Sequence, residues 1–225
     1  MNTYIDVHCH LCDGVPHGAR DASGFICNTT CESQWDAMIG AHTKYSCLYP
    51  AIGIHPWYID DVTPGWDTRL IEKIQVYSNL MIGEIGLDRS RPGIENQQDV
   101  FARQMEIAVR FHRPVHIHCV RAWDLILGQL KQMPLLPPVI VLHRFNANAD
   151  IMRKLMKYDN IYYSFAQHEP AATIVPKDRI LVESDGVADI YLKNIIDNMA
   201  ADRGENGDTW ADVIHNNTMR VIQHG

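Results

Sequence analysis

The chain has 225 residues, 46% of them hydrophobic, and a formal net charge of −7 at pH 7. This length suits one domain over residues 1–225, because a single α/β barrel commonly takes about 200–250 residues. The acidic charge argues against a protein that coats long duplex nucleic acid, but it does not exclude a nuclease whose metal ions bind the phosphates. No apolar run approaches the ~18 residues of a membrane span, and no targeting signal precedes the first strand, so we expect a cytoplasmic protein without a membrane partner.

The first predicted strand, Tyr4 to Val7, runs into the segment Asp6-Val7-His8-Cys9-His10. Side chains alternate between the two faces of a strand, so Asp6, His8 and His10 are expected to point the same way. Two imidazoles at this spacing can bind one metal ion, and the carboxylate can be a third ligand or an orienting partner. This segment is therefore the first candidate metal site.

The chain has six cysteines, and Cys9-x-x-Cys12 and Cys27-x3-Cys31 have the spacing of half zinc sites. On the first strand, however, Cys9 would face away from His8 and His10, which disfavours that interpretation. Reduced thiols are expected instead, because no secretion signal accompanies them.

Seven further short apolar runs predict strands over residues 24–29, 48–54, 80–87, 114–120, 138–142, 160–165 and 180–182. Helices are predicted over residues 33–42, 64–78, 95–111, 123–132 and 147–157, and two more, over 188–202 and 209–223, close the chain. Ser33 is the candidate N-cap of the first helix. Strands that alternate with helices indicate parallel βαβ units, and their near-continuous apolar character fits a sheet buried on both faces. The simplest closure is an α/β fold of the (β/α)8 TIM-barrel type.

In such a barrel the active site lies at the carboxyl ends of the strands. Polar residues follow or end six of the predicted strands at this edge: His8 and His10, His55, Glu84, His118, His143 and Asp185. Side chains placed for unrelated reasons would not share one end of the barrel, so the pattern predicts a metal site there.

Three of the neighbouring residues have alternative roles. Glu84 lies inside an apolar segment, where a carboxylate is costly unless it binds a metal or pairs with a buried arginine. His116 shares a face with His118 but lies one layer deeper, so we expect a hydrogen-bonded core histidine. Asp88 is expected to orient a ligand or to cap a loop.

These motifs resemble the TatD family of metal-dependent deoxyribonucleases, within the amidohydrolase-like barrel superfamily. The matching segments occur in family order and span almost the whole chain. They are Asp6-x-His8-x-His10, Gly53-Ile54-His55-Pro56, Gly83-Glu84-Ile85-Gly86-Leu87-Asp88, Pro114-Val115-x-Ile117-His118, His143-x-Phe145 and Glu183-Ser184-Asp185.

The resemblance implies a site for two divalent metal ions. His8, His10 and Asp185 would hold one ion, His118 and His143 the other, and Glu84 would lie between them. So many nitrogen ligands suit Zn²⁺ or Mn²⁺, and Mg²⁺ less well. Two ions about 3.5–4 Å apart can clamp the attacking and leaving oxygens of a phosphodiester and activate a water molecule. Glu84 and Asp185 are then the catalytic carboxylates, with Asp185 as the general base.

The predicted substrate contacts are His55, Arg121 and Arg144. His55 is expected either to contact a phosphate or an extra ion, or to pack in a loop. The family often has an arginine two residues after the fifth-strand histidine, whereas this chain has Val120 there and Arg121 one residue later. The family's usual Ser-Pro or Ala-Pro is replaced by Gly186-Val187, and its basic loop after the last strand is shortened to residues 188–191. The available rim cations are therefore Arg89, Arg91, Arg121 and Arg144.

The predicted function is metal-dependent hydrolysis of DNA phosphodiester bonds, at ends or in single strands. The partner would then be DNA or a small phosphodiester. An alternative is a hydrolase of a small ester, lactone or amide, which the acidic charge and the shortened loop favour. A non-catalytic metal-binding barrel is a further alternative, but it predicts a missing ligand, and all six are present.

Overall fold

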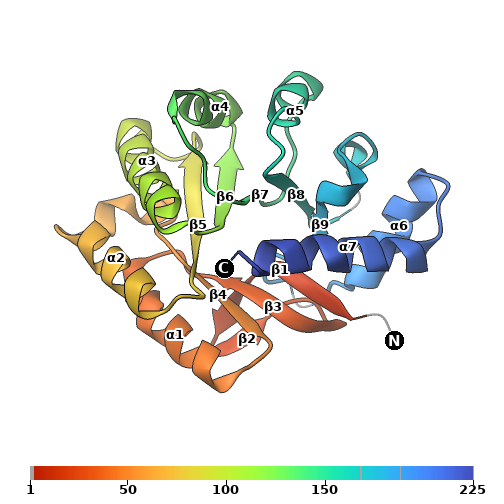
Figure 1. Ribbon diagram of the computed structural model, residues 1–225, viewed down its shortest axis with the longest axis horizontal. Coiled ribbons are helices and arrows are strands. Elements are labelled where there is room, and N and C mark those ends of the chain that lie inside the picture. Colours follow the sequence, from red (N-terminus) through yellow and green to blue (C-terminus); the bar gives the residue numbers. More distant parts are fainter. Residues whose placement is uncertain (1–2, 168, 188, 225) are drawn as a thin grey trace.

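The computed structural model describes residues 3–167, 169–187 and 189–224. Its core is a curled sheet in which eight parallel strands follow one another in chain order (Figure 1). These strands are β1 (Tyr4–Cys12), β3 (Ala22–Asn28), β4 (Leu48–Ile52), β5 (Met81–Asp88), β6 (Val115–Val120), β7 (Ile140–Leu142), β8 (Ile161–Phe165) and β9 (Ile180–Val182). A short strand, β2 (Val15–His17), pairs antiparallel with β1.

The two ends of the parallel sheet meet just beyond β9. The Asp185 N–H donates to the His8 carbonyl of β1 over 2.9 Å, and the Ser184 N–H donates to Asp6 Oδ1 over 3.0 Å. Asp6 Oδ2 also accepts the Ala19 N–H at 2.8 Å. Burial raises the pKa of the Asp6 carboxyl to about 6, although its backbone hydrogen bonds oppose the shift. The predicted (β/α)8 barrel is confirmed, and Asp6 ties its first and last strands together.

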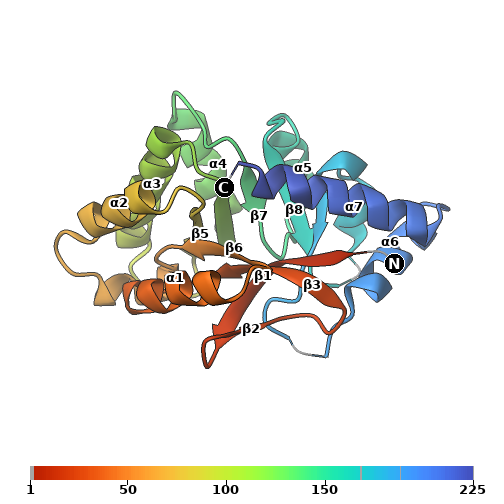
Figure 2. The same cartoon turned by 60° about the horizontal axis from the view of Figure 1, so that its bottom comes forward.

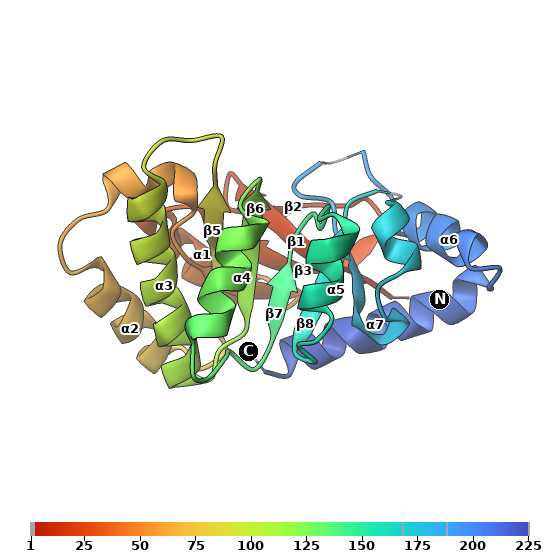
Figure 3. The same cartoon turned by 90° about the horizontal axis from the view of Figure 1, so that it is seen from above.

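Seven α-helices surround the described strands, and Figure 3 shows α3, α4 and α5 side by side in front of the sheet. They are α1 (Trp35–Lys44), α2 (Trp66–Val76), α3 (Ile94–Phe111), α4 (Trp123–Gln132), α5 (Ala149–Leu155), α6 (Leu192–Asp202) and α7 (Gly207–Ile222). No helix of the described residues is long and apolar enough to cross a membrane.

Two of the eight strands are not followed by an α-helix. After β1 the chain turns back as the projecting β1–β2 hairpin (Figure 2), where Asp13 and Gly14 have φ of 51° and 75°. Two successive left-handed residues fit a tight two-residue hairpin turn. After β8 the described residues form only the short 3-10 helices η3 (Pro170–Thr173) and η4 (Lys177–Arg179). These two gaps agree with the predicted helices, none of which falls between the first two predicted strands or between the last two.

Two predicted boundaries near the N-terminus need correction. The first strand continues past Val7, because β2 pairs with it as far as Cys12, so His8 and His10 lie within β1. Ser33 is not an N-cap, because residues 32–34 form the 3-10 helix η1 (Glu32–Gln34) before α1.

The sixth helix begins at Leu192 rather than at position 188, and Ala188 lies outside the described residues. The Asp21 carboxylate accepts the Leu192 and Lys193 N–H groups at 2.8 and 2.9 Å. The cap of α6 therefore comes from a distant segment of the chain, which local sequence does not reveal.

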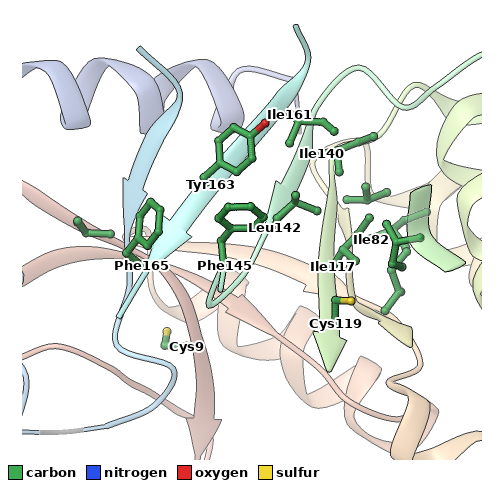
Figure 4. Packing of buried hydrophobic residues seen from close by; sticks show 14 of the residues in the cluster. Cys9, Ile82, Ile117, Cys119, Ile140, Leu142, Phe145, Ile161, Tyr163 and Phe165 are labelled. Atoms are coloured by element: carbon green, nitrogen blue, oxygen red, sulfur yellow. The ribbon is translucent and has the colours of Figure 1, made fainter. Parts of the chain in front are cut away.

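Apolar side chains fill both sides of the barrel wall. Between strands and helices, Phe145 packs on Tyr163 and Phe165 with ring centroids 4.8 and 6.2 Å apart (Figure 4). A second buried cluster joins strand residues such as Val7 and Val141 to Val221 of α7. The cysteines are free, as expected, and Cys9 lies in the first cluster with its Sγ 3.3 Å from that of Cys27.

Two glutamines of α3 fix the carboxyl ends of β4 and β5. Buried Gln104 accepts the Ile54 N–H at 2.8 Å and donates to the Ile54 carbonyl at 3.1 Å, and Gln97 makes the same pair of bonds with Asp88. Each side-chain amide thereby satisfies the N–H and carbonyl of one residue at the end of a strand. These residues are Ile54, which precedes His55, and Asp88 itself.

The substitution Gln104→Leu tests this anchoring. It would leave the N–H and carbonyl of Ile54 without partners, at a cost of about 2–4 kcal/mol in the free energy of unfolding. We expect a melting temperature roughly 5–15 °C lower in a thermal scan. Gln75→Leu, on the exposed surface of α2, should change stability by less than about 0.5 kcal/mol. Equal melting temperatures for the two variants would contradict the anchoring role.

Candidate metal centre

A cavity of about 480 Å³ opens at the carboxyl ends of the barrel strands. Its floor contains most of the predicted site residues, and its walls come from the end of β6 and from the segments that follow β3, β4, β7 and β9. The lining residues are His10, Thr30, His55, Trp57, Tyr58, Glu84, His118, Cys119, Val120, His143, Arg144, Asn146 and Asp185.

Glu84 lies at the centre of this floor and is only 3% exposed. Its carboxylate faces five imidazoles, and among the described residues it pairs with no arginine, so that alternative is wrong. The distances from Glu84 are 2.9 Å to His118 Nδ1, 3.3 Å to His143 Nε2, 3.4 Å to His8 Nε2, 3.5 Å to His55 Nε2 and 3.8 Å to His10 Nε2. Burial opposes ionisation of Glu84. The charges of His143 and His8, and hydrogen bonds from His118 and His143, outweigh burial and hold the pKa of Glu84 well below its usual range.

Two of the histidines have one ring nitrogen engaged and the other directed at Glu84. His10 Nδ1 lies 2.9 Å from the Asn28 carbonyl, which only accepts, so Nδ1 carries the proton. His143 Nδ1 lies 3.1 Å from Glu183 Oε1. Burial alone would lower the pKa of His143, but Glu183 and Glu84 outweigh it and raise this pKa well above its usual value. Glu183 and Glu84 thus favour the protonated His143 ring, and when either ring is neutral with its proton on Nδ1, its Nε2 is available to bind a metal.

His118 has the opposite orientation. Its Nδ1 faces Glu84, and its Nε2 lies 3.6 Å from Asp88 Oδ2. Asp88 also accepts the Ser90 N–H and the Trp57 Nε1–H, at 2.7 and 2.6 Å. The aspartate therefore occupies both expected roles, because it faces a candidate ligand and caps a loop.

His8 is completely buried, and neither of its ring nitrogens has a hydrogen-bond partner among the described residues. Its ring stacks on that of His143 with centroids 3.9 Å apart, and burial together with His143 lowers its pKa. A neutral buried imidazole with an orphaned nitrogen facing a carboxylate is what a metal ligand requires. This observation supports a metal ion in the floor of the cavity.

His55 differs from these four histidines. Its Nδ1 accepts the Trp57 backbone N–H at 3.1 Å, so the proton of the neutral ring lies on Nε2, the atom that faces Glu84. Burial is the main reason that the pKa of His55 is lowered, which favours the neutral ring. A ring nitrogen of His55 lies within 4.8 Å of the potential ligand atoms of Glu84 and His118. In this tautomer, however, Nε2 carries the proton and donates a hydrogen bond, so it does not bind a metal.

Asp185 and Arg144 form the side of the cavity next to β1. Arg144 Nη1 donates to Asp185 Oδ2 at 2.7 Å, and Asp185 Oδ1 lies 3.7 Å from His10 Nε2. Burial opposes ionisation of Asp185, but His10, the neighbouring histidines and Arg144 hold its pKa below the usual range. Both residues have left-handed backbone, with φ of 53° for Asp185 and 44° for Arg144. Such conformations are uncommon outside glycine and often occur at functional sites.

All six predicted ligands belong to groups whose ligand atoms lie within 4.8 Å of one another. Besides the group with His55, these are His8 with His143 and Asp185, and His8 with His10 and Glu84. A set of imidazole nitrogens and carboxylate oxygens is suited to Zn²⁺ or Mn²⁺. The residues present therefore fit a divalent metal centre.

The other predicted site residues are placed less uniformly. His55 and Arg144 line the cavity, but Arg121 does not; its carbonyl accepts Arg89 Nη1 at 2.9 Å. His116 is buried as expected, but neither ring nitrogen reaches a hydrogen-bond partner among the described residues, so the expected hydrogen bond is not formed.

Sequence reasoning gave no role to two residues of the site. Glu183 is buried and accepts both His143 Nδ1 and the Arg144 N–H, the latter at 2.7 Å. A carboxylate directly after an apolar strand, two residues before Asp185, was the available signal. Trp57 lines the cavity, and its position after His55-Pro56 was the corresponding signal.

Comparisons with known proteins concern the family and the fold of the chain. The profile of the family described as TatD related DNase matches residues 5–223. The human 3'-5' RNA nuclease TATDN2 is 25% identical over 219 residues, which cover 81% of this chain and 28% of the human protein. The 3'-5' ssDNA/RNA exonuclease TatD of Pectobacterium atrosepticum is 24% identical over 229 residues, which cover 88% of this chain and 86% of that protein.

The solved structure of YjjV, a TatD homologue from Escherichia coli, has the same fold, with a TM-score of 0.85 over 97% of both chains at 19% identity. The matched segments span 28% of the human relative and 60% and 61% of two further curated relatives from bacteria.

Metal binding to the folded state should stabilise this protein. A ligand at about 100 times its dissociation constant adds ~2.7 kcal/mol, which corresponds to a melting temperature higher by about 5–10 °C in a chain of this size. We expect a chelator to lower the melting temperature by this amount and Zn²⁺ or Mn²⁺ to restore it.

The control compares two histidine variants. His143→Gln should lose most of the metal-induced shift, whereas His215→Gln, whose ring bonds the Thr3 carbonyl outside the cavity, should keep it. An unchanged melting curve, with elemental analysis finding no metal, would argue against a metal centre.

Proposed function

Because the chain belongs to the TatD related DNase family, we propose that it is a metal-dependent hydrolase that cleaves phosphodiester bonds of DNA, at ends or in single strands. The observation that carries the proposal is the ionised, buried Glu84 at the centre of an imidazole cluster on the cavity floor. The names of relatives such as the Pectobacterium 3'-5' ssDNA/RNA exonuclease support the choice of a nucleic acid as the substrate.

In this proposal two divalent ions bind the six side chains. His8, His10 and Asp185 would hold one, His118 and His143 the other, and Glu84 would bind between them. When bound, such ions lower the pKa of a water molecule and neutralise charge on the phosphoryl group. Glu183 and the Asn28 carbonyl hold the His143 and His10 rings through Nδ1, and Asp88 lies 3.6 Å from His118 Nε2.

Asp185 would accept the proton of the attacking water. Its carboxylate is ionised and faces the cavity, but Arg144 now lies against one of its oxygens. A phosphate in the cavity offers Arg144 a second anion of higher charge. We infer that Arg144 contacts the phosphate and thereby leaves one oxygen of Asp185 free to act as the base.

His55 would donate a hydrogen bond to the substrate. Because its Nδ1 accepts from the Trp57 N–H, Nε2–H is available for an unprotonated phosphate oxygen at the cavity floor. Arg121 would contact a more distant phosphate at the rim, since it does not line the cavity itself.

One observation favours a small ester, lactone or amide as the alternative substrate. Two of the four rim cations are already paired, because Arg89 makes two bonds of 2.6 and 2.7 Å to Asp124 and Arg144 binds Asp185. A hydrolase of a small neutral substrate needs no free cations there. A non-catalytic barrel is not favoured, because all six ligand positions are filled by competent side chains. Cytoplasmic localisation stays a prediction.

Asp185→Asn tests the proposed general base. The amide keeps the shape but cannot accept the proton, so we expect turnover to fall at least a hundredfold, within the ~10²–10⁴-fold range of general-base catalysis. Asp189→Asn, the same substitution at an exposed residue paired with Arg20, should leave turnover within about twofold. His116→Gln should also cost far less than Asp185→Asn. Similar inactivation of all three variants, with circular dichroism showing folded protein, would refute the assignment.

The substrate proposal predicts a shallow dependence on salt. A chain of net charge −7 repels a polyanion except near the metal ions and rim arginines, so few phosphates should be contacted. We expect about two to four contacts, and log K for a single strand falls by roughly 0.7 per contact for each tenfold rise in salt. Binding of a labelled oligonucleotide at several salt concentrations measures this slope.

The same cavity predicts a preference for ends or unpaired strands, because the phosphodiester must reach its floor. A gel time course with metal-loaded protein should show single strands shortened, and closed circular duplex cut slowly or not at all. If small esters are hydrolysed and no DNA product appears with any divalent metal, the alternative hydrolase replaces the nuclease.

A further inference from the structure

Trp57 is an exposed aromatic side chain at the edge of the cavity. It follows His55 and Pro56 at the start of η2 (Pro56–Asp61), and both of these neighbours are buried. Trp57 itself is 51% exposed, and it is one of the residues that line the cavity. An indole left half open beside an ion-binding floor indicates a contact with a flat, apolar part of a ligand.

The Trp57 ring is held in place on three sides. Its Nε1–H donates to Asp88 Oδ2 at 2.6 Å, and the guanidinium of Arg91 lies 4.3 Å from the ring centroid. The His55 ring meets it at 82° with centroids 5.3 Å apart. Because Arg91 covers one face and the indole is already fixed, a ligand that stacks on the open surface restricts little further motion.

From this geometry, and on the basis of the nuclease function proposed above, we propose that Trp57 is the stacking platform for the nucleobase next to the scissile phosphodiester. A nucleobase is a flat π-system joined to a phosphate by a short linker, and the indole and the imidazole cluster border one cavity. Arg91 provides a positive charge over one face of the ring.

The proposal explains how a protein with few free cations binds a polyanion. Stacking on an aromatic ring tolerates any base, because every base has a π-face, and it requires a base that is not stacked within a duplex. Trp57 would therefore select unpaired nucleotides without selecting a sequence.

The test compares two labelled single strands with the same backbone. One carries ordinary bases, and the other carries abasic tetrahydrofuran residues at its last two positions at each end. For metal-loaded Trp57→Ala we expect kcat/KM on the base-bearing strand to fall roughly 5- to 150-fold, the range for loss of one stacked base, and to change less than about twofold on the abasic strand. Trp57→Phe, which keeps a ring, should recover most of the activity.

A control variant and a binding measurement separate this proposal from the proposed function. Leu135→Ala removes another exposed apolar side chain, in a groove that does not include the cavity, and should affect neither strand. Binding is measured by fluorescence anisotropy in the metal-loaded Asp185→Asn background, with and without Trp57→Ala.

An equal loss on both strands would show that Trp57 acts only through Asp88 and His118, and it would overturn the platform. A base-dependent loss of binding without hydrolysis of any strand would keep the platform and refute the nuclease. If neither strand binds the metal-loaded protein, both proposals fail.

Discussion

A buried carboxylate among imidazoles is the interaction on which the rest of this structure depends. Glu84 is 3% exposed, and an ionised carboxylate in such a place is costly unless opposite charge or hydrogen bonds surround it. The five imidazoles that provide this environment come from β1, β6 and the segments after β4 and β7. The closed barrel brings these strands and segments to one point, and Glu84 lies there.

Closure in turn relies on carboxylates that hold backbone and rings rather than ions. Asp6 joins the segment after β9 to β1, Asp88 binds Trp57 and the Ser90 N–H beside His118, and Glu183 fixes His143 together with the Arg144 backbone. Each of these groups is buried, so each restricts its neighbours to one arrangement. Ligands positioned in this way need little reorganisation when they bind an ion.

The parts of the structure that local sequence specifies were predicted, and those that depend on distant partners were not. The alternation of apolar runs and helical periods located nearly every strand and helix, and it placed His118 and His143 at one edge. The β1–β2 hairpin was missed because β2 has only three residues and no apolar alternation. The start of α6 was wrong because its cap is Asp21, and the tautomer of His55 follows from the Trp57 N–H, which no residue pattern reveals.

The distribution of charge decides how such a site can bind its substrate. The chain is acidic, and two of its rim arginines, Arg89 and Arg144, are already paired with carboxylates, so long-range attraction of a polyanion is weak. Affinity must then come from contacts at the site itself: the ions, the His55 donor and a contact that does not depend on charge. In our proposal the half-exposed Trp57 provides such a contact. Asp88 accepts the Trp57 Nε1–H and also lies 3.6 Å from His118 Nε2, so the proposed base platform and the candidate metal centre would share one carboxylate.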